Sequence, residues 1–175
     1  MLERAMNEEA YERAVILHQQ RIHSYATYML RNPAEAQDVA QEALVRLWQH
    51  RSRVEHQGAR FWLMRTVYNL CIDRVRQRRV RSEIDDGETA VGLTADAAPG
   101  PHKLAESDEL GHVIEGALTA LSPDDRSVVI MREVQGLPYD EIAGALGVPL
   151  GTVKARLHRA RERLRTRLCR AGVAP

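Results

Sequence analysis

The chain has 175 residues, of which 44% are hydrophobic, 5% are aromatic and 28% are charged. This length allows one modest domain or two small ones, and few aromatic residues combined with many charged ones favour helical bundles. The formal net charge is +1, so total charge by itself does not indicate a nucleic-acid-binding protein. The two cysteines, Cys71 and Cys169, have no metal-ligand spacing, which argues against a disulfide framework and a zinc site.

The N-terminus does not resemble a secretory signal peptide. Residues 1–11 include Glu3, Arg4, Glu8 and Glu9, where a signal peptide needs an apolar run. No apolar stretch approaches the roughly 20 residues that cross a bilayer. We therefore expect a cytoplasmic protein without membrane insertion.

The best-marked helix of the N-terminal half begins at Asn32. Asn is a favourable N-cap, Pro33 suits the first helical position, and Glu35 is placed for a capping box. The apolar residues that follow at helical spacing are Ala36, Val39, Ala40, Ala43, Leu44, Leu47 and Trp48. Another face carries Asp38, Gln41, Glu42 and Val45. By composition alone, such a face is more often solvated surface than a docking site.

A second helix is predicted from about residue 58 to 79. One side is apolar, with Phe61, Met64, Val67, Tyr68, Cys71, Ile72 and Val75. Another side carries Trp62, Thr66, Asn69, Asp73 and Arg76, and an arginine cluster extends to Arg81. An aromatic ring with hydrogen-bonding groups and positive charge suits single-stranded nucleic acid. A single tryptophan is more often core than a stacking platform, so Asn69 and the arginines are the stronger candidates.

Residues 82–103 have the composition of a linker. They contain small residues, glycine, proline and acids without a sustained period. The sequence therefore predicts an N-terminal domain at 1–81 and a C-terminal domain at 104–175, joined by a flexible linker. No stretch shows the alternation of a β-strand, so we predict an all-α fold of two small helical domains. The acidic linker separates two basic clusters, at residues 74–81 and 154–170.

The C-terminal quarter predicts a helix-turn-helix. Residues 139–146 form a short amphipathic helix, Gly147 can end it in a left-handed conformation, and a turn follows through Pro149. In the next helix, the core-facing stripe consists of Val153, Leu157, Ala160, Leu164 and Leu168. The other face carries Gly151, Thr152, Lys154, Ala155, His158 and Arg159. A basic helix face can be solvated surface, but the tight turn and the preceding helix favour insertion into a major groove of DNA.

Three segments together resemble the bacterial RNA polymerase sigma factors of the extracytoplasmic-function (ECF) subfamily. They are NPAEAQDVAQEALVRLWQH, FWLMRTVYNLCIDRVRQRR and LSPDDRSVVIMREVQGLPYDEIAGALGVPLGTVKARLHRARERLR. They cover nearly the whole chain in the family's order. The resemblance implies sigma region 2 at residues 1–81, for clamp binding and for recognition and melting of the minus-ten element. It also implies sigma region 4 at 104–175, for recognition of the minus-thirty-five element.

The resemblance assigns candidate residues to three surfaces. The polymerase-binding surface would consist of Asp38, Gln41, Glu42 and Arg46. The minus-ten surface would consist of Asn69, Asp73, Arg74 and Arg76, to which the residue pattern adds Trp62. In the family, the loop before this helix, here residues 50–58, reads a flipped base. The minus-thirty-five surface would consist of Lys154, Ala155, His158 and Arg159, with Arg132, Thr152 and Arg156 near the DNA backbone.

The implied function is promoter-specific transcription initiation in a stress or envelope response. Its partners would be core RNA polymerase, promoter DNA and an anti-sigma factor. An alternative is a stand-alone helix-turn-helix repressor or activator, which would need a self-association surface. An enzyme has less support, because the sequence lacks a glycine-rich phosphate loop and the HExxH and GxSxG motifs. Asp124 and Asp125, which follow Ser122 and Pro123, indicate a helix start and not a catalytic carboxylate pair. We therefore expect no catalytic residue, metal, cofactor or small-molecule substrate.

Overall fold

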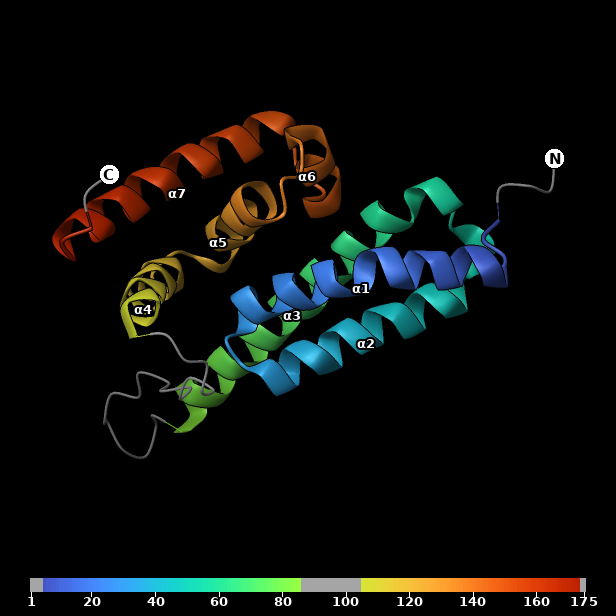
Figure 1. The fold of residues 1–175 in the computed structure, drawn as a ribbon, viewed down its shortest axis with the longest axis horizontal. Helices are drawn as coiled ribbons and strands as arrows, with labels where there is room; N and C mark the ends of the chain where they lie inside the picture. The colour runs from blue at the N-terminus through green and yellow to red at the C-terminus, as the bar shows by residue number, and fades with distance from the viewer. Residues whose placement is uncertain (1–4, 86–104, 174–175) are drawn as a thin grey trace.

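The computed structural model describes residues 5–85 and 105–173, and these two ranges consist mainly of helices joined by short connections (Figure 1). Within them the regular elements are α-helices and short 3₁₀ or π turns, without a β-strand. The predicted all-α class is confirmed. Most of the predicted linker lies outside the described residues, although α3 continues to Asp85, four residues past the predicted domain end. None of the described helices is both long and apolar enough to cross a membrane.

The N-terminal part is a three-helix bundle of α1 (Glu8–Leu30), α2 (Pro33–His50) and α3 (Ala59–Asp85). Asn7 caps α1, because its Oδ1 accepts a 2.8 Å hydrogen bond from the backbone N–H of Ala10. The largest side chains buried between the three helices include Ile22, Tyr25, Met29, Leu47, Leu63 and Met64.

The predicted start of α2 is confirmed. Asn32 Oδ1 accepts a 3.2 Å hydrogen bond from the backbone N–H of Glu35, and Pro33 occupies the first turn. The Glu35 carboxylate, which the sequence places for a capping box, pairs with Arg78 of α3 at 2.7 Å. Arg31 closes the turn from α1 with a left-handed φ of 53°. Asn32 therefore fixes the residue at which α2 begins, and Glu35 attaches that first turn to α3.

The C-terminal part contains four helices and a single π turn. They are α4 (Ala105–Thr119), α5 (Pro123–Val129), η3 (Ile130–Val134), α6 (Tyr139–Leu146) and α7 (Leu150–Arg170). The predicted helix-turn-helix is confirmed at α6 and α7, with Gly147 at a φ of 66° between them. Val153, Leu157 and Ala160 are buried as expected, whereas Leu164 and Leu168 are half-buried.

The two parts pack against each other, which the sequence did not predict. Buried apolar residues of both belong to one continuous cluster, with α5 against α1 and α3 and with α6 against α3 (Figure 1). Tyr25 of α1 and Ser127 of α5 share a 2.6 Å hydrogen bond that is fully buried. The ring of Phe61 on α3 fills the space that a Cβ at Gly144 of α6 would need. This contact explains a glycine within a short helix, where alanine would be favoured by about 1 kcal/mol.

Polar contacts surround this shared core. Arg60 of α3 pairs with Glu141 of α6 at 2.5 Å. On the opposite side, the Tyr68 hydroxyl donates to Asp124 at 3.1 Å. The Arg126 guanidinium reaches from α5 to the carbonyl oxygen of Met29 at the end of α1, at 3.1 Å. The N-terminal and C-terminal parts therefore pack together as one compact unit in this structure.

Candidate nucleic-acid and polymerase interfaces

The candidate polymerase surface lies on the side of α2 that faces away from the bundle core. Asp38 and Gln41 are exposed, and Val45 is 53% exposed beside them. Glu42 links this face to α3, because its carboxylate pairs with Arg46 at 2.6 Å and approaches Arg74 at 3.8 Å. The four candidate residues are thus accessible together, with the amide and the carboxylates framing one apolar side chain.

The candidate minus-ten surface follows one side of α3. Asn69, Asp73 and Arg76 are exposed at three- and four-residue spacing, so their side chains project from the same face. Arg74 is turned toward α2 by its approach to Glu42. This face is distinct from the side of α3 that packs against α6, where Phe61 lies.

Trp62 combines features of a core residue and of an accessible aromatic side chain. Its side chain is half-buried and packs against the bundle core, and its ring centre lies 5.8 Å from that of His50. The structure therefore gives this residue a packing role while leaving part of the indole accessible at the start of the candidate minus-ten surface.

The segment before α3 is more ordered than a loop prediction would suggest. It forms two 3₁₀ turns, η1 (Arg51–Arg53) and η2 (His56–Gly58), around a buried Val54. The backbone N–H of Met6 donates to the carbonyl oxygens of Arg51 and Val54 at 3.1 and 3.3 Å. The Arg51 guanidinium stacks 3.8 Å from the ring centre of Trp48. The N-terminal segment and α2 thus hold this connection in a defined shape.

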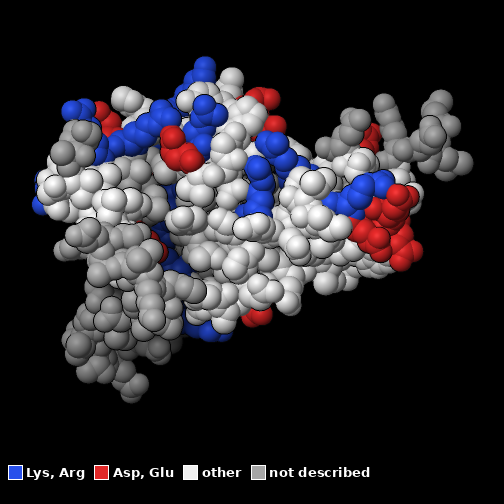
Figure 2. Space-filling model, viewed as in Figure 1, with Lys and Arg blue, Asp and Glu red and all other residues white. Residues whose placement is uncertain are grey.

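The recognition face of α7 is open to solvent. Gly151, Lys154, Ala155 and His158 are exposed along one side, beginning at a 42% exposed Leu150. Lys and Arg side chains gather along the edge of the molecule formed by α7 (Figure 2). Small residues near the N-terminus of the helix allow close approach to a groove, and cations further along suit phosphates. Thr152 is half-buried beside this face.

Two arginines assigned near the DNA backbone are engaged inside the protein. Arg156 has a side chain only 19% exposed and pairs with Asp124 at 3.1 Å, on the side of α7 facing α5. Arg132 donates to the carbonyl oxygen of Leu137 at 3.0 Å and lies 4.9 Å from the ring centre of Tyr139. Arg156 is therefore turned away from the exposed recognition face, and Arg132 is held by contacts with neighbouring residues of its own turn.

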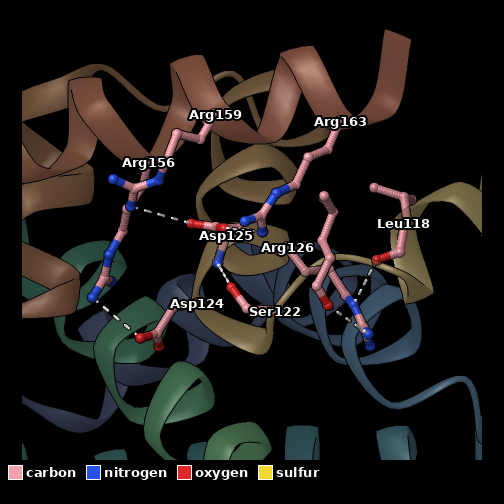
Figure 3. A network of polar contacts seen from close by, with 9 residues as sticks. Leu118, Ser122, Asp124, Asp125, Arg126, Arg156, Arg159 and Arg163 are labelled. Carbon is pink, nitrogen blue, oxygen red and sulfur yellow. Dashed lines mark hydrogen bonds and ion pairs between the residues drawn. The ribbon is translucent and has the colours of Figure 1, made fainter. Parts of the chain in front are cut away.

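An acidic turn that the sequence analysis treated only as a helix start lies beside the recognition helix. Ser122 caps α5 as expected, accepting a 3.2 Å hydrogen bond from the backbone N–H of Asp125. The adjacent carboxylates of Asp124 and Asp125 contact three arginines of α7, namely Arg156, Arg159 and Arg163 (Figure 3). These arginines share one face of α7 at three- and four-residue spacing, but this spacing does not identify their acidic partner.

Neither cysteine forms part of these surfaces. Cys71 is buried in α3, and burial raises the pKa of its thiol to about 12. It therefore stays protonated near neutral pH, unlike the thiolates of redox sensors. Cys169 is exposed near the end of α7. Across the described ranges, no group of three or more His, Cys, Asp or Glu side chains is arranged to hold a metal ion.

Two family models match most of the described chain. The family models "Sigma-70 region 2" and "Sigma-70, region 4" match residues 15–81 and 112–164. SigW of Bacillus subtilis, an ECF RNA polymerase sigma factor, is 31% identical over 93% of this chain and 90% of its own length. The chain belongs to the ECF sigma factors.

Other relatives extend the same similarity. The ECF sigma factor SigL of Mycobacterium tuberculosis is 36% identical to this sigma factor, over 85% of this chain and 83% of the relative. The ECF sigma factor SigE of Mycolicibacterium smegmatis is 34% identical over 92% of this chain. The match spans 62% of that longer relative.

Solved structures show the same fold. RpoE of Bartonella quintana, in complex with the anti-sigma factor NepR, superposes with a TM-score of 0.70 at 24% identity, covering 90% of this chain and 96% of that one. CnrH, in complex with the cytosolic domain of CnrY, gives a TM-score of 0.69 at 23% identity, covering 94% and 90%. At these identities the comparison supports the architecture of this sigma factor.

Proposed function

We propose that this sigma factor binds core RNA polymerase and directs initiation at promoters that carry two upstream elements. The observation that carries the proposal is an exposed helix-turn-helix face on α7 in the same chain as a sigma region 2 bundle with exposed faces on α2 and α3. A stand-alone repressor or activator would use the helix-turn-helix, but it would have no role for the exposed faces of the region 2 bundle.

The face of α2 would dock on the polymerase. Asp38 and Gln41 offer exposed hydrogen-bonding groups, and Val45 offers an apolar side chain one turn beyond Gln41. A polar rim around an apolar contact is typical of protein interfaces. Glu42 and Arg46, already paired with each other, would add charge complementarity and orientation.

The face of α3 would capture the melted minus-ten strand, and α7 would read the minus-thirty-five duplex. Exposed Asn69 and Arg76 can donate to bases and phosphates of a single strand. On α7, Lys154, His158 and Arg159 can reach base edges in the major groove. Each surface makes few phosphate contacts, so free DNA should bind weakly and the polymerase should supply the effective concentration.

Docking on a promoter would require the two parts to separate. Elements centred about 25 base pairs apart lie roughly 85 Å apart at about 3.4 Å per base pair. A packed chain of this length has a radius of gyration of about 16 Å. The contacts between α3 and α6, including Phe61 against Gly144, would therefore open on the polymerase, and the linker together with the widths of the two parts would cover the distance.

The biological setting follows from the family. We propose that the protein acts in the cytoplasm with the polymerase, in a stress or envelope response, under an anti-sigma factor. The solved complexes of RpoE with NepR and of CnrH with CnrY support the last point, because they show related folds bound to such partners.

The docking role of α2 can be tested by the double substitution Asp38→Ala and Gln41→Ala. Both side chains are exposed, so the thermal unfolding midpoint should stay unchanged. Affinity for core polymerase should fall about tenfold, as expected for two contacts at an interface. Fluorescence titration of labelled protein with core polymerase measures this change.

The matched control is the pair Glu12→Ala and Gln19→Ala on exposed positions of α1. It removes the same charge and the same amide away from α2 and should leave the affinity as in the wild type. If the α2 variant and the control bind core polymerase with equal affinity, this face of α2 does not dock on the polymerase.

A further inference from the structure

Asp125 is unusual among the described residues because its carboxylate is buried. Its side chain is 7% exposed, and the other buried polar residue of these ranges is the neutral Ser127. A buried carboxylate is costly unless charged or hydrogen-bonding partners compensate it. Its position in the first turn of α5, at the positive end of the helix dipole, supplies part of the compensation.

The remaining compensation comes from the recognition helix. Arg163 Nη1 donates to Asp125 Oδ2 at 3.2 Å, and Arg159 Nη2 lies 3.9 Å from Asp125 Oδ1 (Figure 3). The two arginines are one turn apart on α7, so one carboxylate serves both. The shorter contact anchors the carboxylate, and the second oxygen remains directed at Arg159.

Arg159 stands at the border of the exposed recognition face. Its side chain is 56% exposed, and the neighbouring Ala155 and His158 are exposed as well. A guanidinium has five N–H donors in a planar fork. At 3.9 Å the Asp125 carboxylate attracts the guanidinium by charge without a hydrogen bond, so its donors stay available for a ligand in front of α7.

We propose that Asp125 is a positioning residue for promoter reading, whose carboxylate holds the Arg159 guanidinium so that its free edge meets a guanine of the minus-thirty-five element. The inference rests on the proposed function. Guanine is the base that arginine reads with two parallel hydrogen bonds, to O6 and N7. Such a pair depends on the orientation of the fork, and a fork held by a buried anchor loses less freedom on binding.

The neighbouring carboxylate provides a matched control. Asp124 lies one residue earlier in the same helical turn, but it contacts Arg156 at 3.1 Å and the Tyr68 hydroxyl at 3.1 Å. Asp124→Asn and Asp125→Asn thus make the same chemical change at adjacent positions. Only the second removes the charge facing Arg159.

The test is promoter selection from a library with a randomised minus-thirty-five element, using core polymerase loaded with the full-length protein. The wild type should prefer guanine at one position, and Arg159→Ala should abolish that preference. Asp125→Asn should weaken the preference about tenfold at this same position and leave the others unchanged, because an arginine–guanine pair discriminates by roughly five- to hundredfold. Asp124→Asn should keep it.

Several outcomes overturn the inference. One is a guanine preference of Asp125→Asn equal to that of the wild type. Another is an equal loss of base preference at all positions of the minus-thirty-five element. A third is a higher affinity for promoter DNA with unchanged base preference. Persistence of the guanine preference in Arg159→Ala would also refute it. If Asp125→Asn loses helical circular dichroism, Asp125→Glu decides, since it keeps the charge but shifts the carboxylate and should give an intermediate preference. Absence of specific starts with the wild type would instead refute the proposed function itself.

Discussion

Replacing Arg126 by methionine should lower the free energy of unfolding by about 3 kcal/mol, the largest stability effect that we expect from a charged side chain among the described residues. The guanidinium donates to four carbonyl oxygens, those of Leu118, Thr119, Leu121 and Met29, at 2.9 to 3.4 Å. Methionine has a similar length and no donor, so the carbonyls would lose a charged partner.

The position of these carbonyls makes the effect large. Leu118 and Thr119 end α4, where carbonyl oxygens lack partners within the helix. Met29 lies in the last turn of α1, in the other part of the molecule. Arg126 therefore caps α4 and attaches it to the N-terminal bundle at the same time. Burial lowers the pKa of this guanidinium, yet arginine remains charged at neutral pH, so the contact persists there.

Urea unfolding monitored by circular dichroism measures the free energy of unfolding, and thermal unfolding gives the midpoint temperature. A change of about 3 kcal/mol should lower the thermal midpoint by about 6 to 12 °C for a protein of this size. Arg13→Met is the matched control, because Arg13 is exposed and makes only a 2.6 Å surface pair with Glu9. Indistinguishable unfolding curves for the two variants would show that the contacts of Arg126 contribute no more than a surface pair.

Combining Lys154→Ala with Arg159→Ala should reduce transcription from promoters that depend on the minus-thirty-five element about a hundredfold. Both side chains are exposed on α7, and each base contact of this kind is worth about 1 to 3 kcal/mol. Affinity for core polymerase should remain as in the wild type, because α2 is unaffected. Initiation rates at saturating core polymerase, compared with binding titrations, separate the two effects.

The control for this pair removes two positive charges elsewhere. Arg13 and Arg170 are both exposed and lie outside the three candidate surfaces. Their double alanine variant should transcribe within a few-fold of the wild type. An equal loss in the control and in the α7 variant would indicate a general charge effect and not reading of an element.

Local signals in the sequence were sufficient to predict the boundaries of several elements. Asn32, Ser122 and Gly147 mark helix ends by short-range hydrogen bonds or backbone conformation, and each was found in that role. The start of α1 could have been recognised in the same way, since Asn7 is followed by Glu8 and Glu9.

The packing between the two parts was not accessible from local patterns. Tyr25 meets Ser127 across 102 residues, and Arg60 meets Glu141 across 81. Phe61 reads as a member of the apolar stripe of its own helix, but it contacts Gly144 in the other part. Periodicity identifies the face that a helix buries and not the element that covers it.

The same distinction between local and long-range signals applies to the candidate residues of α7. Exposure of Lys154, Ala155 and His158 follows from their place opposite the core-facing stripe of α7. Arg156 lies at the edge between these faces, and its burial depends on Asp124, a residue more than 30 positions earlier in the chain. Assignment by helical position alone could not distinguish Arg156 from an exposed neighbour.

Run-off transcription with purified core polymerase tests the central claim most directly. A pool of genomic promoter fragments is transcribed with and without this protein, and the transcript starts are sequenced. We predict new starts that share two upstream motifs at fixed spacing, and their loss in the Lys154→Ala, Arg159→Ala variant. Absence of new starts, together with sequence-selective binding of the protein alone to duplex DNA, would contradict the account and favour a stand-alone repressor or activator.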